Sequence, residues 1–161
     1  ALGSAFSTFV GQNFGAGKHH RIRQCTWRAC LLGLGMAVAV AAAVILFRRP
    51  ILSAFVDQSS ADGAAVTAYG AEYLLIMSSF LPVLYLLHLF RAGLQALGNT
   101  TVPLLSGVME FTMRVGTVLL LPGLLGYRAV FAAEVVAWTG AALLLGVCYL
   151  RKLRRLPHTD L

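Results

Sequence analysis

An uncharged run of nineteen residues, 29–47, limits what this chain can fold into. As an α-helix it would be roughly 28 Å long, close to the ~30 Å hydrocarbon core of a bilayer. Hydrophobic residues make up 58% of the chain and charged residues only 12%, about half the charged fraction that is usual in a soluble domain. The sequence therefore predicts an all-α fold, a polytopic bundle of transmembrane helices.

Five apolar segments predict membrane helices, and the first of these is partial. We expect helices at about residues 1–14, 29–47, 66–97, 102–122 and 129–150. Together they would form one transmembrane unit over residues 1–155, with a cytoplasmic tail over residues 156–161. The chain starts within a helical pattern and without Met, so we expect it to be the C-terminal part of a longer protein.

Proline and turn residues predict where these helices end or bend. The Arg-Arg-Pro sequence at 48–50 is expected to end the second helix, with a brief interfacial helix at 51–56 and an exposed loop at 57–63. Pro82 is expected to kink the third helix, because proline frees a backbone carbonyl. The short turn at 98–103 predicts that the helices on either side are antiparallel neighbours.

The net charge of +7 arises from basic residues at the ends of the apolar runs. The alternation of helices places nine of the thirteen Lys and Arg residues on one side, and the positive-inside rule assigns that side to the cytoplasm. We therefore expect a multi-pass protein of the plasma membrane with a cytoplasmic C-terminus. This distribution favours contact with membrane lipid over binding to nucleic acid. Arg91 is expected to reach the inner interface by snorkelling.

Two charged residues fall inside the fourth predicted helix. Glu110 and Arg114 are four residues apart, so they share one helix face at a separation of roughly 6 Å. A lone charge at mid-depth costs at least ~2.5–3.5 kcal/mol, which favours a structural pair between these two residues. The alternative is that Glu110 binds the coupling ion or proton. Glu134 lacks an adjacent base and is the better proton candidate, whereas Glu72 is expected to be a solvated helix-end charge.

Four further side chains, at helical spacing, could line an adaptable apolar cavity, although ordinary core or lipid contact is the favoured interpretation. They are Met77, Phe80, Tyr85 and Met109.

Other sequence features predict structure rather than chemistry. Gln12 and Asn13 are expected to cap and join helices rather than touch a substrate. The three cysteines form no CxxC pattern, so we expect no metal site. GxSxG, HExxH and Walker A patterns do not occur, so no enzymatic activity and no cofactor beyond a coupling ion are expected.

The order of several motifs resembles one transporter family, multidrug and toxic compound extrusion (MATE). The matching features are Gly11-Gln-Asn-Phe-Gly-Ala-Gly17 before a basic loop, Arg91-Ala-Gly-Leu-Gln-Ala-Leu-Gly98, the Asn99-Thr-Thr-Val-Pro103 turn, Glu110 with Arg114, and Ala137-Trp138. The resemblance implies a second lobe, from the end of helix eight to helix twelve, of a twelve-helix protein. It also implies an N-terminal lobe as partner, which this sequence does not contain.

This resemblance implies secondary active efflux of organic cations or drugs by antiport with sodium ions or protons. The family's coupling acids lie in its first lobe or in helices seven and ten, and the tenth helix here carries only Glu72 near its outer end. The coupling ion therefore stays open. Two alternatives remain: a lipid-linked oligosaccharide flippase of the wider superfamily, or a non-transporting scaffold or gene fragment.

Overall fold

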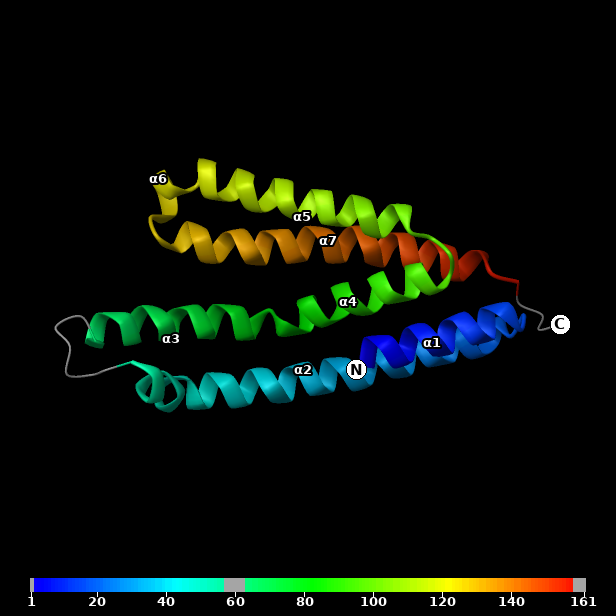
Figure 1. Cartoon of the computed structure of the whole chain (residues 1–161), viewed down its shortest axis with the longest axis horizontal. Helices are drawn as coiled ribbons and strands as arrows, with labels where there is room; N and C mark the ends of the chain where they lie inside the picture. Colours follow the sequence, from blue (N-terminus) through cyan, green and yellow to red (C-terminus); the bar gives the residue numbers. More distant parts are fainter. Residues whose placement is uncertain (1, 57–62, 158–161) are drawn as a thin grey trace.

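The computed structural model describes residues 2–56 and 63–157, and every regular element in those ranges is a helix (Figure 1). The expected loop falls largely on residues 57–62 and the end of the expected tail on residues 158–161, both outside the described ranges. The helices are α1 (Leu2–Gly15), α2 (His19–Phe55), α3 (Gly63–Ser79), α4 (Leu81–Ala96), α5 (Thr101–Leu120), α6 (Pro122–Leu125) and α7 (Arg128–Arg155).

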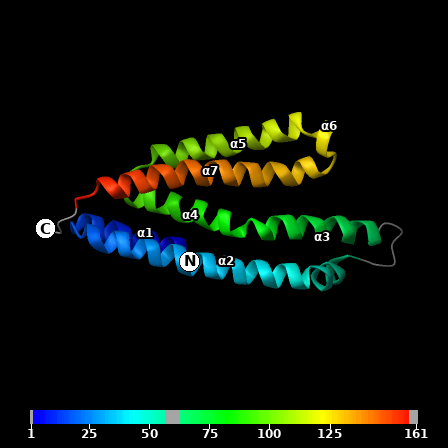
Figure 2. The same ribbon diagram turned by 180° about the vertical axis from the view of Figure 1, so that it is seen from behind.

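All helices except the short α6 run roughly parallel or antiparallel to one long axis (Figures 1 and 2). α7 lies between α5 on one side and the α3–α4 segment on the other, and α2 packs against α3 and α4. α1 packs in the angle between α2 and α4. The short turn after α4 was predicted to make α4 and α5 direct neighbours, but α5 packs mainly against α7. The turn is short, yet the two helices diverge from it and α7 fills the space between them.

One end of the bundle carries most of the basic side chains, and we call it the basic end. It contains the start of α2, the turn between α4 and α5, and the end of α7. The opposite, distal end contains the end of α2, the start of α3, and α6. Glycines in the left-handed region terminate helices at the basic end, with φ of 69° at Gly17 and 76° at Gly98. Such φ values favour glycine, because a side chain there would be strained.

The second membrane helix is longer than the sequence predicted. α2 continues through Pro50 to Phe55 instead of ending at residues 48–50, so the separate interfacial helix at 51–56 is not formed. Two side chains donate to backbone carbonyls in the turns on either side of the proline. The Arg48 guanidinium donates to the Ile45 carbonyl (2.8 Å), and the Ser53 hydroxyl donates to the Pro50 carbonyl (2.9 Å). α7 is also longer than expected and ends with three basic residues in its last turn, which favour a helix C-terminus.

The third expected helix is broken near Pro82. α3 and α4 meet at Phe80 with a bend of 47°. Pro82 lies in the first turn of α4, where its missing N–H costs no helical hydrogen bond. The break therefore lies two residues before Pro82, at the place where the sequence predicted a kink.

Three helices, α2, α5 and α7, are long and apolar enough to cross a membrane, and the bent α3–α4 pair is a fourth candidate span. α1 has 14 residues. Large exposed apolar side chains cover the outer faces of these helices, among them Leu46, Phe111 and Leu119. An apolar exterior of this kind suits lipid rather than water. The chain is an integral membrane protein with an all-α helical bundle fold.

The large buried side chains gather in the half of the bundle next to the basic end. Tyr149 of α7 is fully buried there, and its hydroxyl shares a 2.7 Å hydrogen bond with Thr26 of α2. Its ring stacks on Phe90 (5.6 Å between centroids) and meets the edge of Phe6 (6.4 Å). Gly93 of α4 faces the same ring. This packing joins α1, α2, α4 and α7 into one unit.

Candidate functional site

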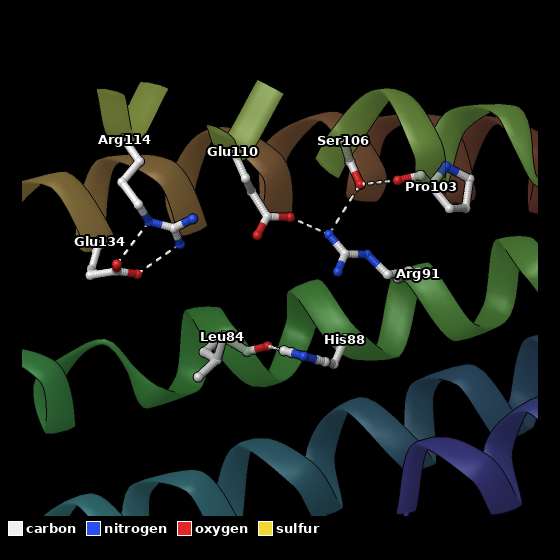
Figure 3. A network of polar contacts seen from close by, with 8 residues as sticks. All are labelled: Leu84, His88, Arg91, Pro103, Ser106, Glu110, Arg114 and Glu134. Atoms are coloured by element: carbon white, nitrogen blue, oxygen red, sulfur yellow. Dashed lines mark hydrogen bonds and ion pairs between the residues drawn. The ribbon is translucent and has the colours of Figure 1, made fainter. Parts of the chain in front are cut away.

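Every glutamate in the described residues forms an ion pair with an arginine from another helix. The three pairs extend from the middle of the bundle to its distal end, and Figure 3 shows two of them. They are Arg91–Glu110, Arg114–Glu134 and Arg128–Glu72. Ion pairs of this kind are how charged side chains are accommodated within a membrane.

The first pair joins α4 to α5. Arg91 points across to the carboxylate of Glu110 and also donates to the Ser106 hydroxyl at 3.2 Å. Ser106 is fully buried and donates in turn to the Pro103 carbonyl at 2.8 Å. The side chains of Arg91 and Glu110 are 27% and 16% exposed. The prediction that Arg91 snorkels to the interface is therefore wrong, because an acid on the next helix offers it a partner at its own depth.

The second pair joins α5 to α7 and replaces the expected pair of Glu110 with Arg114. The prediction that Glu134 lacks an adjacent base is wrong, because Arg114 reaches it from the neighbouring helix. Arg114 contacts Glu134 through two nitrogens, Nε to Oε1 at 2.7 Å and Nη2 to Oε2 at 2.8 Å. Figure 3 shows Glu110 turned toward Arg91 and Arg114 turned toward Glu134. The i,i+4 spacing puts Glu110 and Arg114 on one face, but the neighbouring helices supply partners in better geometry. Only the Nη2 contact has hydrogen-bond geometry; the Nε contact is an ion pair without one.

The third pair joins α7 to α3 at the distal end. Arg128 Nε lies 2.7 Å from Glu72 Oε1, and the Tyr127 hydroxyl donates to the other carboxylate oxygen at 2.8 Å. The rings of Tyr69 and Tyr127 meet edge to face at 4.9 Å. Glu72 is 27% exposed and paired, so the expectation of a merely solvated charge is wrong.

The three pairs together link three membrane spans in a closed ring. They connect α4 to α5, α5 to α7, and α7 to α3, and α3 and α4 belong to one bent span. Removing the charge from any one carboxylate would leave an arginine without its counter-charge. The arrangement can therefore couple the protonation or ion occupancy of a carboxylate to the separation of two helices.

The four expected cavity residues lie at separate places. Met77 is buried in α3, and Phe80 sits at the break before α4. Tyr85 packs over Gly33 of α2, donates to the Ala29 carbonyl at 3.4 Å, and lines an apolar groove of about 370 Å³. Met109 reaches toward Gly140 of α7. The structure does not bring the four together into one cavity.

The other predicted residues lie at the end of α1. Asn13 is buried, its side-chain amide donates to the Phe9 carbonyl (2.8 Å), and its own carbonyl accepts from the Lys18 amide (2.9 Å). The Gln12 carbonyl accepts from the Ala16 amide at 3.1 Å. Within residues 2–56 and 63–157, no group of three or more His, Cys, Asp or Glu side chains could hold a metal ion.

Sequence reasoning missed Arg91 as the partner of Glu110. A signal was present, because the turn between α4 and α5 is short. Counting ~1.5 Å per residue from that turn puts Arg91 and Glu110 within about 6 Å of each other in depth, a difference that an arginine side chain can span. The hydrogen bond between Thr26 and Tyr149 had no such signal, since the two residues lie 123 positions apart.

Comparison with known proteins finds similarity among family models and among solved structures. The sequence model of the family described as MatE matches residues 1–120. Among solved structures, the chain is similar to one described as the outward-facing conformation of a multidrug resistance MATE family transporter of the MOP superfamily, with 19% identity and a TM-score of 0.84. That match covers 98% of this chain and 35% of the other, so this chain spans about a third of that protein's length. No curated protein matches.

Proposed function

We propose that this chain, which belongs to the MATE family, is part of an efflux transporter that exports organic cations by antiport with sodium ions or protons. The observation that carries the proposal is the family match over residues 1–120, which agrees with the helical fold over 98% of the chain. The chain would supply the second lobe, from the end of helix eight to helix twelve. A first lobe would then be its partner, with the substrate path between the two.

The two deeper ion pairs supply candidates for the coupling step. Glu134 is more exposed than Glu110, with side-chain values of 31% and 16%, so an ion from a water-filled path would reach Glu134 more easily. A proton or sodium ion at Glu134 would neutralise the charge that holds Arg114 and so loosen α5 from α7. We therefore assign coupling to Glu134 with Arg114 as its charge partner, and a structural role to Glu110 with Arg91.

A substrate surface within this chain is best supported near Tyr85. Its groove is also lined by Met36, Val40, Leu84 and His88. Met36 is a flexible side chain that adapts to different ligand shapes, and the tyrosine ring offers a face to an organic cation. Met77, Phe80 and Met109 lie outside this groove, so we assign them to helix packing.

The membrane orientation follows from charge. The basic end carries the start of α2 and the last turn of α7, both rich in Lys and Arg. The positive-inside rule supports a cytoplasmic basic end and C-terminus, and an efflux role supports the plasma membrane.

An accumulation assay with the complete gene product tests this proposal. Cells expressing it would be loaded with ethidium under imposed sodium or proton gradients, beside Glu134→Gln, Glu110→Gln and, as a matched control at the distal rim, Glu72→Gln. We expect wild type and Glu72→Gln to lower accumulation and Glu134→Gln to lose the dependence on one gradient. Loss of gradient dependence in Glu110→Gln instead would move the coupling role to Glu110, and normal gradient dependence in both variants would place coupling outside this chain.

Absence of export from well-expressed wild type would contradict the efflux proposal itself. A protein that instead moves a lipid-linked oligosaccharide between leaflets would support the flippase alternative. A protein that does neither would support the non-transporting scaffold.

A further inference from the structure

We propose that the groove between α1 and α2 is a binding site for one anionic phospholipid, taken from the leaflet at the basic end. The groove has a volume of about 540 Å³. Its lining includes Leu2, Ala5 and Phe9 from α1, and Arg21, Arg28 and Leu32 from α2. This inference is independent of the proposed transport activity, because it rests on the shape and charge of the groove alone.

The groove has a charged part and an apolar part, which match the headgroup and the acyl chains of a phospholipid. Arg21 and Arg28 are seven residues apart on α2, so they lie on the same face, two turns or about 10 Å apart. The groove continues from Arg28 to Leu32, deeper in the bundle, where Leu2 and Ala5 of the antiparallel α1 form the other wall. A phosphate can lie between the two guanidinium groups while an acyl chain follows the apolar part.

The charge of the groove selects an anion. Arg21 and Arg28 are both exposed, and all three glutamates of the described residues are paired with other arginines. The lining contains no acidic side chain. A phosphate diester would supply the counter-charge and accept hydrogen bonds from both guanidinium groups.

The depth of the groove favours a lipid over a soluble phosphate. Trp27, next to Arg28 on α2, is 70% exposed, and tryptophan concentrates at the level of the lipid headgroups. Arg28 is therefore at headgroup level, with the apolar part of the groove below it in the hydrocarbon. Basic pockets between membrane helices are known to hold anionic headgroups in this way.

Native mass spectrometry of the purified complete protein with added lipid tests the site. Phosphatidylglycerol and phosphatidylcholine would be titrated separately into wild type, Arg21→Gln/Arg28→Gln, and the control Arg154→Gln, a basic residue at the same end that lies outside the groove. We expect one phosphatidylglycerol to bind wild type and the control more tightly than phosphatidylcholine. Each basic side chain at a membrane surface strengthens anionic lipid binding by about fivefold, so the double variant should lose roughly 25-fold in affinity.

Two more variants keep the test decisive if Arg21→Gln/Arg28→Gln folds poorly. Arg21→Lys/Arg28→Lys retains the charge and should retain the preference for phosphatidylglycerol. Ala5→Phe narrows the apolar part and should weaken binding although both arginines remain. The proposal is overturned if wild type shows no preference for phosphatidylglycerol, which is the result expected if another helix covers the groove. It is also overturned if Ala5→Phe binds normally, or if only substitution of Arg151 and Arg155, which line a different groove, removes the lipid.

Discussion

The two halves of the bundle are held together by different interactions. Next to the basic end, the largest fully buried side chains interlock, among them Tyr149, Ile22 and Leu87. Toward the distal end, the buried residues of α7 are Ala129, Ala133 and Ala137. There the helices are joined by Arg114–Glu134 and Arg128–Glu72. One half is closed by fully buried packing. The other is joined by ion pairs and by edge-to-face contacts between partly exposed rings, Tyr69 with Tyr127 and Tyr73 with Phe131.

This difference indicates which half can open. Helix association in lipid depends on close packing and polar contacts, because lipid tails are as apolar as the helices. Tightly packed, buried side chains have few alternative arrangements. An ion pair, in contrast, loses its attraction once an ion or proton neutralises the carboxylate. The basic half should therefore move as one body, and the distal half should be the part whose helices separate.

The strongest test of the packed half is Tyr149→Ala. The substitution removes a ring that contacts Phe6, Phe90 and Gly93, and the hydrogen bond to Thr26. Truncating a buried aromatic side chain costs about 3–5 kcal/mol. Among the substitutions proposed, we expect this one to lower the melting temperature of the purified complete protein the most. Tyr149→Phe is the matched control and should lose only about 0.6–1 kcal/mol, the value of one hydrogen bond in a membrane protein. Equal losses in both variants would show that the hydrogen bond, not the packing, holds this half.

Glycine substitutions compare the two halves directly. A Cβ at Gly93 would lie 2.5 Å from the fully buried Tyr149 ring and 3.1 Å from Phe6, so Gly93→Ala should destabilise by about 1–3 kcal/mol. A Cβ at Gly140 would lie 2.3 Å from the Met113 sulfur, at the end of a flexible side chain. The thioether can rotate away, and alanine favours the helix by about 1 kcal/mol. Gly140→Ala should therefore change the melting temperature little. A loss as large as that of Gly93→Ala would contradict the difference between the halves.

The sequence identifies apolar runs readily because each depends on local composition. The uncharged run at 29–47 lies within α2, and Pro82 predicted a bend that the structure places at Phe80. The end of α2 was predicted wrongly because Pro50 was taken as a helix stop. The structure shows that α2 runs through Pro50, with Arg48 and Ser53 donating to backbone carbonyls in the adjacent turns.

The sequence singled out only some of the charged residues that form ion pairs. Glu110, Arg114 and Glu134 all take part in ion pairs, but the pairing depends on which helices are neighbours. Spacing along one helix identified Glu110 and Arg114 as partners, whereas α4 and α7 supply the actual partners, Arg91 and Glu134. Contacts between helices depend on packing that a single helix face does not encode.

A double-mutant cycle measures how much the deepest pair contributes. Glu110→Ala should destabilise the protein because it leaves Arg91 without a counter-charge in a mostly shielded site, and Arg91→Met should do the same to Glu110. The double variant should be more stable than the two single losses imply, with a coupling energy of about 1–2 kcal/mol. Thermal unfolding of the four proteins gives this value. Strict additivity would mean that the pair does not hold α4 to α5.

Removing the charge of Glu72 at the distal rim is expected to lower stability the least. The dependence of this loss on salt concentration distinguishes an exposed ion pair from a shielded one. Arg128 is 59% exposed and Glu72 27% exposed, so the attraction between them is largely screened by water and ions. Glu72→Gln should lower the melting temperature slightly at low ionic strength and not at all near ~1 M salt, where the screening length is about 3 Å. Glu110→Gln, at a more shielded pair, should keep most of its effect in the same salt. If salt abolishes both effects equally, water reaches both pairs alike, and the depth difference between the middle of the bundle and its rim has no energetic consequence.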